Sequence, residues 1–149
     1  MGSTFRVSGN FAGPGDVISS VAGDDGLFIV YEANQERVDQ EDLYSVSLRN
    51  TQITRLSNSS PGDSIVDYAI TEDDNIVVYI SSDGTKGELF TSRINNSNPT
   101  KINPQTSASE HILAFKINPA NSQIVYSTKA LELKNHQCCL HRLGGLELK

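Results

Sequence analysis

The chain lacks tryptophan, a disulfide framework and any long apolar run. Its only two cysteines, Cys138 and Cys139, are neighbours, and adjacent cysteines rarely bond each other because the small ring strains the peptide between them. The sequence therefore leaves the redox compartment open. No apolar run approaches the roughly 18 residues of a membrane-spanning helix, so we expect no membrane insertion. Residues 1–4 lack a basic segment followed by an apolar one, which predicts no signal peptide in this chain.

Basic residues are also scarce. The chain has 12 Lys and Arg against 18 Asp and Glu, a net charge of −6, and no cluster of basic residues. We therefore expect no binding to nucleic acid or to anionic membrane. Apolar residues make up 37% of the 149 positions, which is enough for the core of one domain. The abundance of Ser, Thr, Asn and Gly indicates short strands joined by many turns.

The most informative feature that is present is an apolar segment ending in tyrosine, which occurs three times. The closing residues are Tyr31, Tyr79 and Tyr126, separated by 48 and then 47 residues. A fixed period in this range is the signature of a repeat architecture. Each segment follows an acidic or Asn-rich turn, and each turn follows another apolar strand. These preceding strands are predicted at residues 17–22, 65–70 and 112–117.

Beyond each tyrosine the sequence predicts a polar loop and a third strand. The loops are residues 32–41, 81–87 and 127–136, and the third strands are residues 42–48, 88–94 and 137–143. Fourth strands follow at residues 53–57 and 99–103. Four antiparallel strands in about 47 residues are typical of a propeller blade. A helical repeat would need apolar residues at a 3.6-residue period, and a sandwich has no reason to repeat its sequence this closely.

The predicted fold is therefore all-β, with three four-stranded antiparallel propeller blades in a single domain over residues 1–149. The blades span about residues 16–57, 63–103 and 110–149. Residues 4–8 match the fourth strands, so they are predicted to be the outer strand of a preceding blade. Residues 144–149 are predicted to form a compressed fourth strand or a tail. Strand 4–8 could complete the third blade, within the chain or in another copy.

These segments resemble the TolB-type propeller repeat, a WD40-like blade. The resemblance rests on a turn at residues 118–121, on Ile-Val-Tyr at 29–31, on Asp-Leu-Tyr-Ser-Val at 42–46 and on Thr-Arg-Leu at 54–56. At 138–139 two cysteines replace the usual aliphatic and aromatic pair. The resemblance implies a scaffold for protein–protein interaction that has no catalytic residues and is usually six-bladed. It also implies a periplasmic or extracellular location in bacteria.

Three blades do not close a propeller, because known propellers have four to eight. Two copies sum to six, so we expect a homodimer in which two chains assemble head to tail into one six-bladed ring. Exchange of strand 4–8 between the copies would bury a strand edge. The alternative is that the chain is a fragment of a longer propeller.

No cofactor or metal is predicted. His136, Cys138, Cys139 and His141 are zinc-ligand types, but alternate residues of a strand point to opposite faces and cannot close a tetrahedral site. The acidic clusters at 24–25 and 72–74 lack the spacing of a calcium loop. They are interpreted as hairpin turns.

No enzymatic activity is predicted either. The sequence contains no Gly-rich phosphate loop and no plausible Ser/His/Asp or Cys/His set, and all three histidines lie in the third repeat. Two alternatives to a protein-binding scaffold stay open. One is a propeller that binds a sugar or peptide ligand, and the other is a non-catalytic propeller module of a larger hydrolase.

Binding is expected on one side of the blades. The loops between second and third strands and the connections between blades emerge there together, and such loops carry binding residues on a rigid scaffold. The polar candidates on this side are Glu36, Arg37, Asp39, Asp83 and Lys86.

Overall fold

The computed structural model describes residues 4, 6–103, 110–118, 123–130 and 136–143. This part of the chain forms strands and no helix, so it contains no helix that could cross a membrane. The first blade contains β1 (Val17–Ala22), β2 (Phe28–Arg37), β3 (Gln40–Ser47) and β4 (Ile53–Arg55). The second contains β5 (Ser64–Ile70), β6 (Ile76–Ser82), β7 (Gly87–Arg93) and β8 (Asn96–Lys101). The third contains β9 (Glu110–Ile117), β10 (Gln123–Ala130) and β11 (His136–Arg142).

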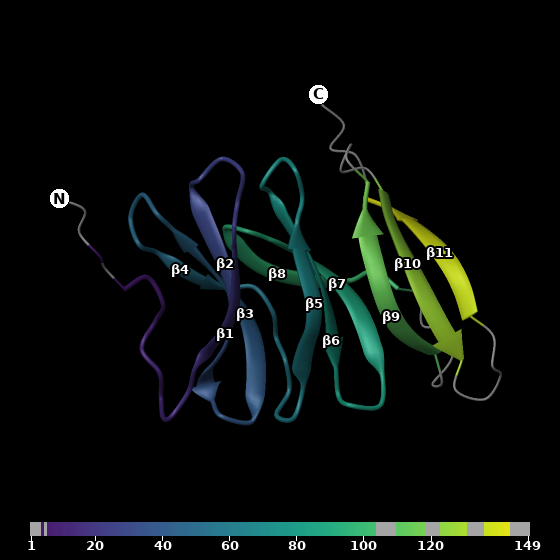
Figure 1. The fold of residues 1–149 in the computed structure, drawn as a ribbon, viewed down its shortest axis with the longest axis horizontal. Coiled ribbons are helices and arrows are strands. Elements are labelled where there is room, and N and C mark those ends of the chain that lie inside the picture. Colours follow the sequence, from purple (N-terminus) through teal and green to yellow (C-terminus); the bar gives the residue numbers. More distant parts are fainter. Residues whose placement is uncertain (1–3, 5, 104–109, 119–122, 131–135, 144–149) are drawn as a thin grey trace.

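Figure 1 shows the three sheets side by side in chain order. Each is an antiparallel meander in which sequential strands are neighbours. The prediction of an all-β chain built from three antiparallel sheets is therefore confirmed. The first two sheets have four strands, whereas the described part of the third has three. The predicted fourth strand at residues 144–149 lies outside the described residues.

The prediction of a loop at residues 32–41 is wrong for most of this segment. β2 continues to Arg37, β3 begins at Gln40, and only Val38 and Asp39 form the turn between them. The polar side chains of this stretch suggested a loop. Antiparallel pairing satisfies the backbone of a hairpin whatever the side chains are, and Glu32 is itself buried. The corresponding turn of the second blade is residues 83–86.

Two apolar layers of the core lie between neighbouring blades. Between the first and second blades, Val30, Leu43 and Leu56 pack with Val77 and Tyr79. Between the second and third blades the same positions recur in the next repeat, and the layer contains Val78, Leu89, Ile112, Ile124 and Tyr126. Each blade is thus stabilised mainly by the apolar surface that it buries against its neighbours.

The N-terminal segment covers the outer face of the first blade. Residues 4 and 6–8 do not form a strand, but Val7 and Phe11 pack against the buried Tyr31 and Tyr44. In the predicted alignment Val7 corresponds to Leu56, and Leu56 packs against Tyr79 of the second blade in the same way. The segment therefore covers the first blade as the end of a preceding blade would.

An aromatic pair marks the middle of each complete blade. Tyr31 stacks on Tyr44 and Tyr79 stacks on Phe90, both with ring centroids 5.3 Å apart. In the third blade the register pairs Tyr126 with Cys139. The cysteine thus occupies the position of the second aromatic ring, as the sequence comparison of the repeats predicted.

Candidate functional site

The connection between the first and second blades contains a tight turn. The Asp63 amide donates to the Ser60 carbonyl at 3.0 Å, and Gly62 has a φ of 90°. Pro61 before this glycine fits a type II turn, since proline favours its first central position and glycine its second. The Gly62 amide also donates to the Asp39 carbonyl at 2.7 Å. The turn is thereby fixed to the β2–β3 hairpin.

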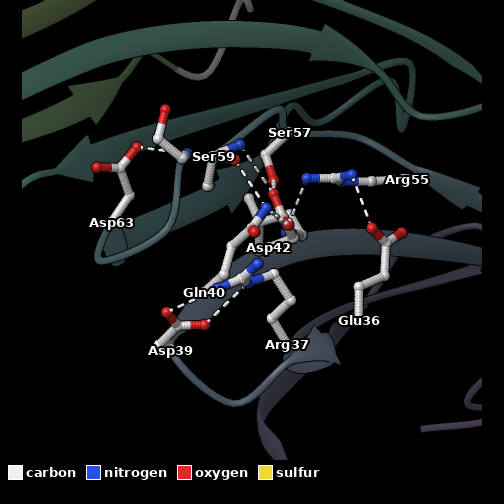
Figure 2. Close-up of polar contacts among 11 residues, drawn as sticks. Glu36, Arg37, Asp39, Gln40, Asp42, Arg55, Ser57, Ser59 and Asp63 are labelled. Carbon is white, nitrogen blue, oxygen red and sulfur yellow. Dashed lines mark hydrogen bonds and ion pairs between the residues drawn. The ribbon is translucent and has the colours of Figure 1, made fainter. Parts of the chain in front are cut away.

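The buried Asp42 carboxylate holds the beginning of this connection (Figure 2). It accepts hydrogen bonds from Arg55 Nη2 at 2.7 Å and Ser57 Oγ at 2.5 Å. It also accepts from the Ser59 amide and from Gln40 Nε2, both at 3.0 Å. Gln40 Nε2 in turn donates to the Ser59 carbonyl at 2.7 Å. This network joins β3, β4 and residues 57–59 into one rigid unit.

Three of the predicted binding residues, Glu36, Arg37 and Asp39, lie at the end of the first blade. Arg37 and Asp39 form a two-point ion pair with distances of 3.0 and 3.1 Å, and both side chains are exposed. Glu36 is paired with Arg55 at 3.0 Å. These charges are satisfied within the first blade, as Figure 2 shows.

The other two predicted residues, Asp83 and Lys86, lie in the β6–β7 turn. Asp83 Oδ1 accepts from the Thr85 hydroxyl and from the amides of Thr85 and Lys86. These hydrogen bonds, led by the one from the Thr85 side chain, lower the pKa of Asp83 below its ordinary value. Lys86 Nζ lies 3.0 Å from Glu88, whose carboxylate also contacts Lys101 at 2.7 Å. The Asp83 carboxylate is thus ionised and has no ion pair among the described residues.

A cavity of about 430 Å³ lies between the connection at residues 58–63 and the second blade. Its polar wall includes Asn58, Ser59 and Asp63, and Asp83 and Lys86 stand on the side of the hairpin turn. Its apolar wall is the stacked pair of Tyr79 and Phe90. This volume suits a small molecule or a single large side chain.

The predicted binding side therefore contains a cavity, but only two of the five named residues, Asp83 and Lys86, line it. Tyr79 and Phe90 lie in predicted strands and Asp63 lies at the predicted connection between the first and second blades, and none of the three was named as a candidate. Only the register of the second sheet and the turn at Pro61 and Gly62 bring these residues together.

A second polar group lies in the first blade, next to the second. Glu32 is only 7% exposed, and its Oε2 accepts from Ser19 Oγ at 2.8 Å. Ser19 Oγ also lies 2.8 Å from the hydroxyl of Tyr68 in the second blade. Burial raises the pKa of Glu32; the Ser19 hydrogen bond opposes this effect and the charge of Glu41 adds to it.

The histidines and cysteines of the third blade do not form a metal site among the described residues. Cys138 is exposed and Cys139 is half-buried, and both are free thiols. No group of three or more His, Cys, Asp or Glu side chains converges anywhere in the part of the chain that the structure describes.

The sheets define a β-propeller type of fold, and comparison with solved structures supports a TolB-like form of it. A protein from Agrobacterium tumefaciens assigned as TolB superposes with a TM-score of 0.59 at 15% identity. An oligogalacturonate lyase in complex with manganese gives 0.61 at 15% identity. A puromycin-hydrolysing peptidase of Mycobacterium tuberculosis gives 0.56 at 8% identity. At these identities the likeness shows the fold alone. No protein-family model and no curated protein matches the chain.

The alignments cover most of this chain but only part of each known structure. They include 92% of this chain and 48% of the Agrobacterium protein, and 94% of this chain and 38% of the lyase. For the peptidase the shares are 76% and 19%. The chain therefore spans about half, or less, of the propeller-containing proteins that it resembles.

Proposed function

We propose that this chain is a non-catalytic scaffold for protein–protein interaction, built as one half of a six-bladed ring whose other half is a second copy. The observation that carries the proposal is the free face of the third blade, which no part of the described chain covers. Val125 is 38% exposed, whereas Val30 and Val78, the equivalent residues of the first two blades, are 0% exposed. Cys138 is likewise exposed where Leu43 and Leu89 are fully buried.

The free face of the third blade thus has the residue pattern of an interior face. Leu140, which pairs with Val125 across β10 and β11, adds a further apolar side chain that is 54% exposed. Exposed apolar patches of this kind mark protein interfaces. In the proposed ring the first blade of a second copy, with Val7 and Phe11 on its outer face, packs against the third blade. A ring of two such halves agrees with the 48% coverage of the Agrobacterium protein.

The cavity supports the binding role. It lies on the side of the blades where the β6–β7 turn and the connection between blades come together. The proposed scaffold therefore presents a recognition pocket on a rigid support.

A Val125→Glu variant tests the assembly. A charge placed in a buried apolar interface is strongly unfavourable, so we expect this variant to be monomeric at concentrations where the unmodified chain is dimeric. Val66→Glu is the matched control, because Val66 is 55% exposed in the middle blade and lies on neither open face. Equal masses for all three proteins by light scattering on a sizing column would contradict the proposal.

A sugar-binding propeller is the second candidate. The ring of Phe90, which lines the cavity beside Asn58 and carboxylates, is a surface on which a sugar ring could rest. Titration with methyl galactoside, followed by amide NMR shifts, decides this candidate. Shifts confined to the cavity would favour a saccharide over a protein partner.

A further inference from the structure

The cavity contains two carboxylates that the fold does not neutralise. Asp63 accepts a hydrogen bond from the Ser60 amide at 2.7 Å, and Asp83 accepts from the β6–β7 turn. Neither has an ion pair among the described residues. The third carboxylate of the lining, Glu88, is held by two lysines. The cavity thus has negative charge available for a ligand.

The wall beside these carboxylates is aromatic. Tyr79 and Phe90 both line the cavity and are stacked on each other with an interplanar angle of 15°. Tyr79 is buried and Phe90 is half-buried, so Phe90 offers the accessible aromatic surface. A cation placed against an aromatic ring is attracted by the electrons of the ring. A planar guanidinium can stack on the ring while its N–H groups bond a carboxylate, which a compact ammonium cannot do.

The cavity wall is also fixed in place before any ligand arrives. The Asp42 network holds residues 57–59, and the hydrogen bond from Gly62 to Asp39 holds the turn that carries Asp63. In addition, the buried Ser59 hydroxyl has no hydrogen-bond partner in the part of the chain that the structure describes. A wall that is already ordered loses little entropy when a ligand binds.

We propose that this cavity binds an arginine side chain of a protein partner, with the guanidinium between the carboxylates of Asp63 and Asp83 and against the ring of Phe90, which is backed by Tyr79. The proposal rests on the proposed binding function and names the chemistry of the partner. It predicts that partners present an exposed arginine on an extended segment, and that binding weakens as salt rises.

Amide NMR titration with N-acetyl-arginine amide tests the proposal, with N-acetyl-citrulline amide as the neutral probe of nearly the same shape. We expect the arginine probe to shift the amide signals around the cavity. The citrulline probe should bind about tenfold more weakly, because it lacks the charge that strengthens hydrogen bonds to a carboxylate. N-acetyl-lysine amide should bind with an affinity between those of the arginine and citrulline probes.

The variants Asp83→Asn and Asp63→Asn remove one charge each and leave an oxygen that can still accept the hydrogen bonds of the turns. Each should weaken arginine binding about three- to tenfold. Asp67→Asn is the matched control, since Asp67 is exposed on β5 and does not line the cavity. It should leave binding unchanged.

Three results would overturn the proposal: equal binding of the arginine and citrulline probes, no shifts at the solubility limit, or equal effects of all three variants. Shifts around the cavity with methyl galactoside alone would assign the cavity to a saccharide instead. The titration is repeated on Val125→Glu, because the cavity lies within one copy. Failure of the arginine site and failure of the dimer are thereby separate results.

Discussion

At the scale of single residues, the carboxylate of Asp42 connects the fold to the candidate site. It is 1% exposed and accepts four hydrogen bonds from β3, β4 and the connection that forms the cavity wall. Removing one partner of a buried charged network leaves the others desolvated and unsatisfied. The residue therefore contributes to stability and also positions the wall.

Asp42→Asn should lower the free energy of unfolding by about 2–4 kcal/mol, because the amide loses the charge opposite Arg55 and turns a donor toward other donors. Denaturant unfolding followed by circular dichroism measures the change. Asp39→Asn is the control: Asp39 is exposed and paired only with the exposed Arg37, so no measurable change is expected. Equal effects of the two substitutions would show that the Asp42 network is not important for stability.

Glu32 gives a prediction about pH. Its pKa is raised by burial in the folded state, so the folded chain keeps a proton that the unfolded chain releases. The contribution of Glu32 to the free energy of unfolding is therefore fully present below the ordinary pKa of 4.5. It is lost as pH rises toward the folded-state pKa. Glu32→Gln removes this loss. At pH 7 we expect the Tm of this variant to be a few degrees higher, which corresponds to a gain on the order of 1 kcal/mol in the free energy of unfolding. At pH 4 we expect little change in Tm.

Thermal unfolding at the two pH values checks this prediction. The groups around Glu32 are Ser19 on β1, Glu41 on β3 and Tyr68 on β5, and a glutamine can replace the hydrogen bonds of the neutral acid. An equal gain at both pH values would mean that packing, not ionisation, causes the effect.

At the scale of elements, the third blade differs from the first two by its missing ring. Tyr126 pairs with Cys139, whereas Tyr31 and Tyr79 each stack on an aromatic partner. Cys139→Phe should restore the stack and raise the free energy of unfolding by about 1 kcal/mol. Thermal unfolding measures the gain, and Gln137→Ala, at an exposed position on the same strand, should have no effect. A lower Tm for Cys139→Phe would show that the space between the blades cannot hold the ring.

The strands could largely be predicted from the sequence because alternation and the tyrosine period are local signals. β1 is found at its predicted residues, and the predicted strands 65–70 and 112–117 correspond to β5 and β9. The second half of β2 was missed because its polar residues resemble a loop, although Glu32 is buried by contacts from another strand. The outer strand of the second blade is shifted for a similar reason, since β8 begins at Asn96 and not at Pro99. β4 begins at its predicted residue, Ile53, and ends at Arg55.

The candidate site was predictable only in its location. The side of the molecule follows from strand order, and Asp83 and Lys86 follow from the hairpin turn. Asp63, Tyr79 and Phe90 meet in one cavity because the connection at residues 58–63 folds against the second blade, and no local pattern shows which side chains such packing leaves at a surface. Glu36 and Arg37 were plausible as charged residues, but they are paired within their own blade.

At the scale of the whole molecule, the N-terminal segment connects the two proposed halves. Val7 covers Tyr31 and Tyr44 as Leu56 covers Tyr79, so in the proposed ring this segment lies between the first blade of one copy and the third blade of the other. A chain lacking residues 1–8 should keep its sheets, which circular dichroism measures. The dissociation constant of its dimer should be higher, so that monomers are present at concentrations where the unmodified chain is dimeric. An unchanged dissociation constant would show that the segment has no role in assembly.

The solution mass of the unmodified chain tests the central claim most directly. The account predicts a mass near twice the 16.2 kDa of one chain, measured by light scattering on a sizing column and falling only on dilution. A single species of 16.2 kDa at all concentrations would contradict it, because the exposed face of the third blade would then be stable in water without a second copy.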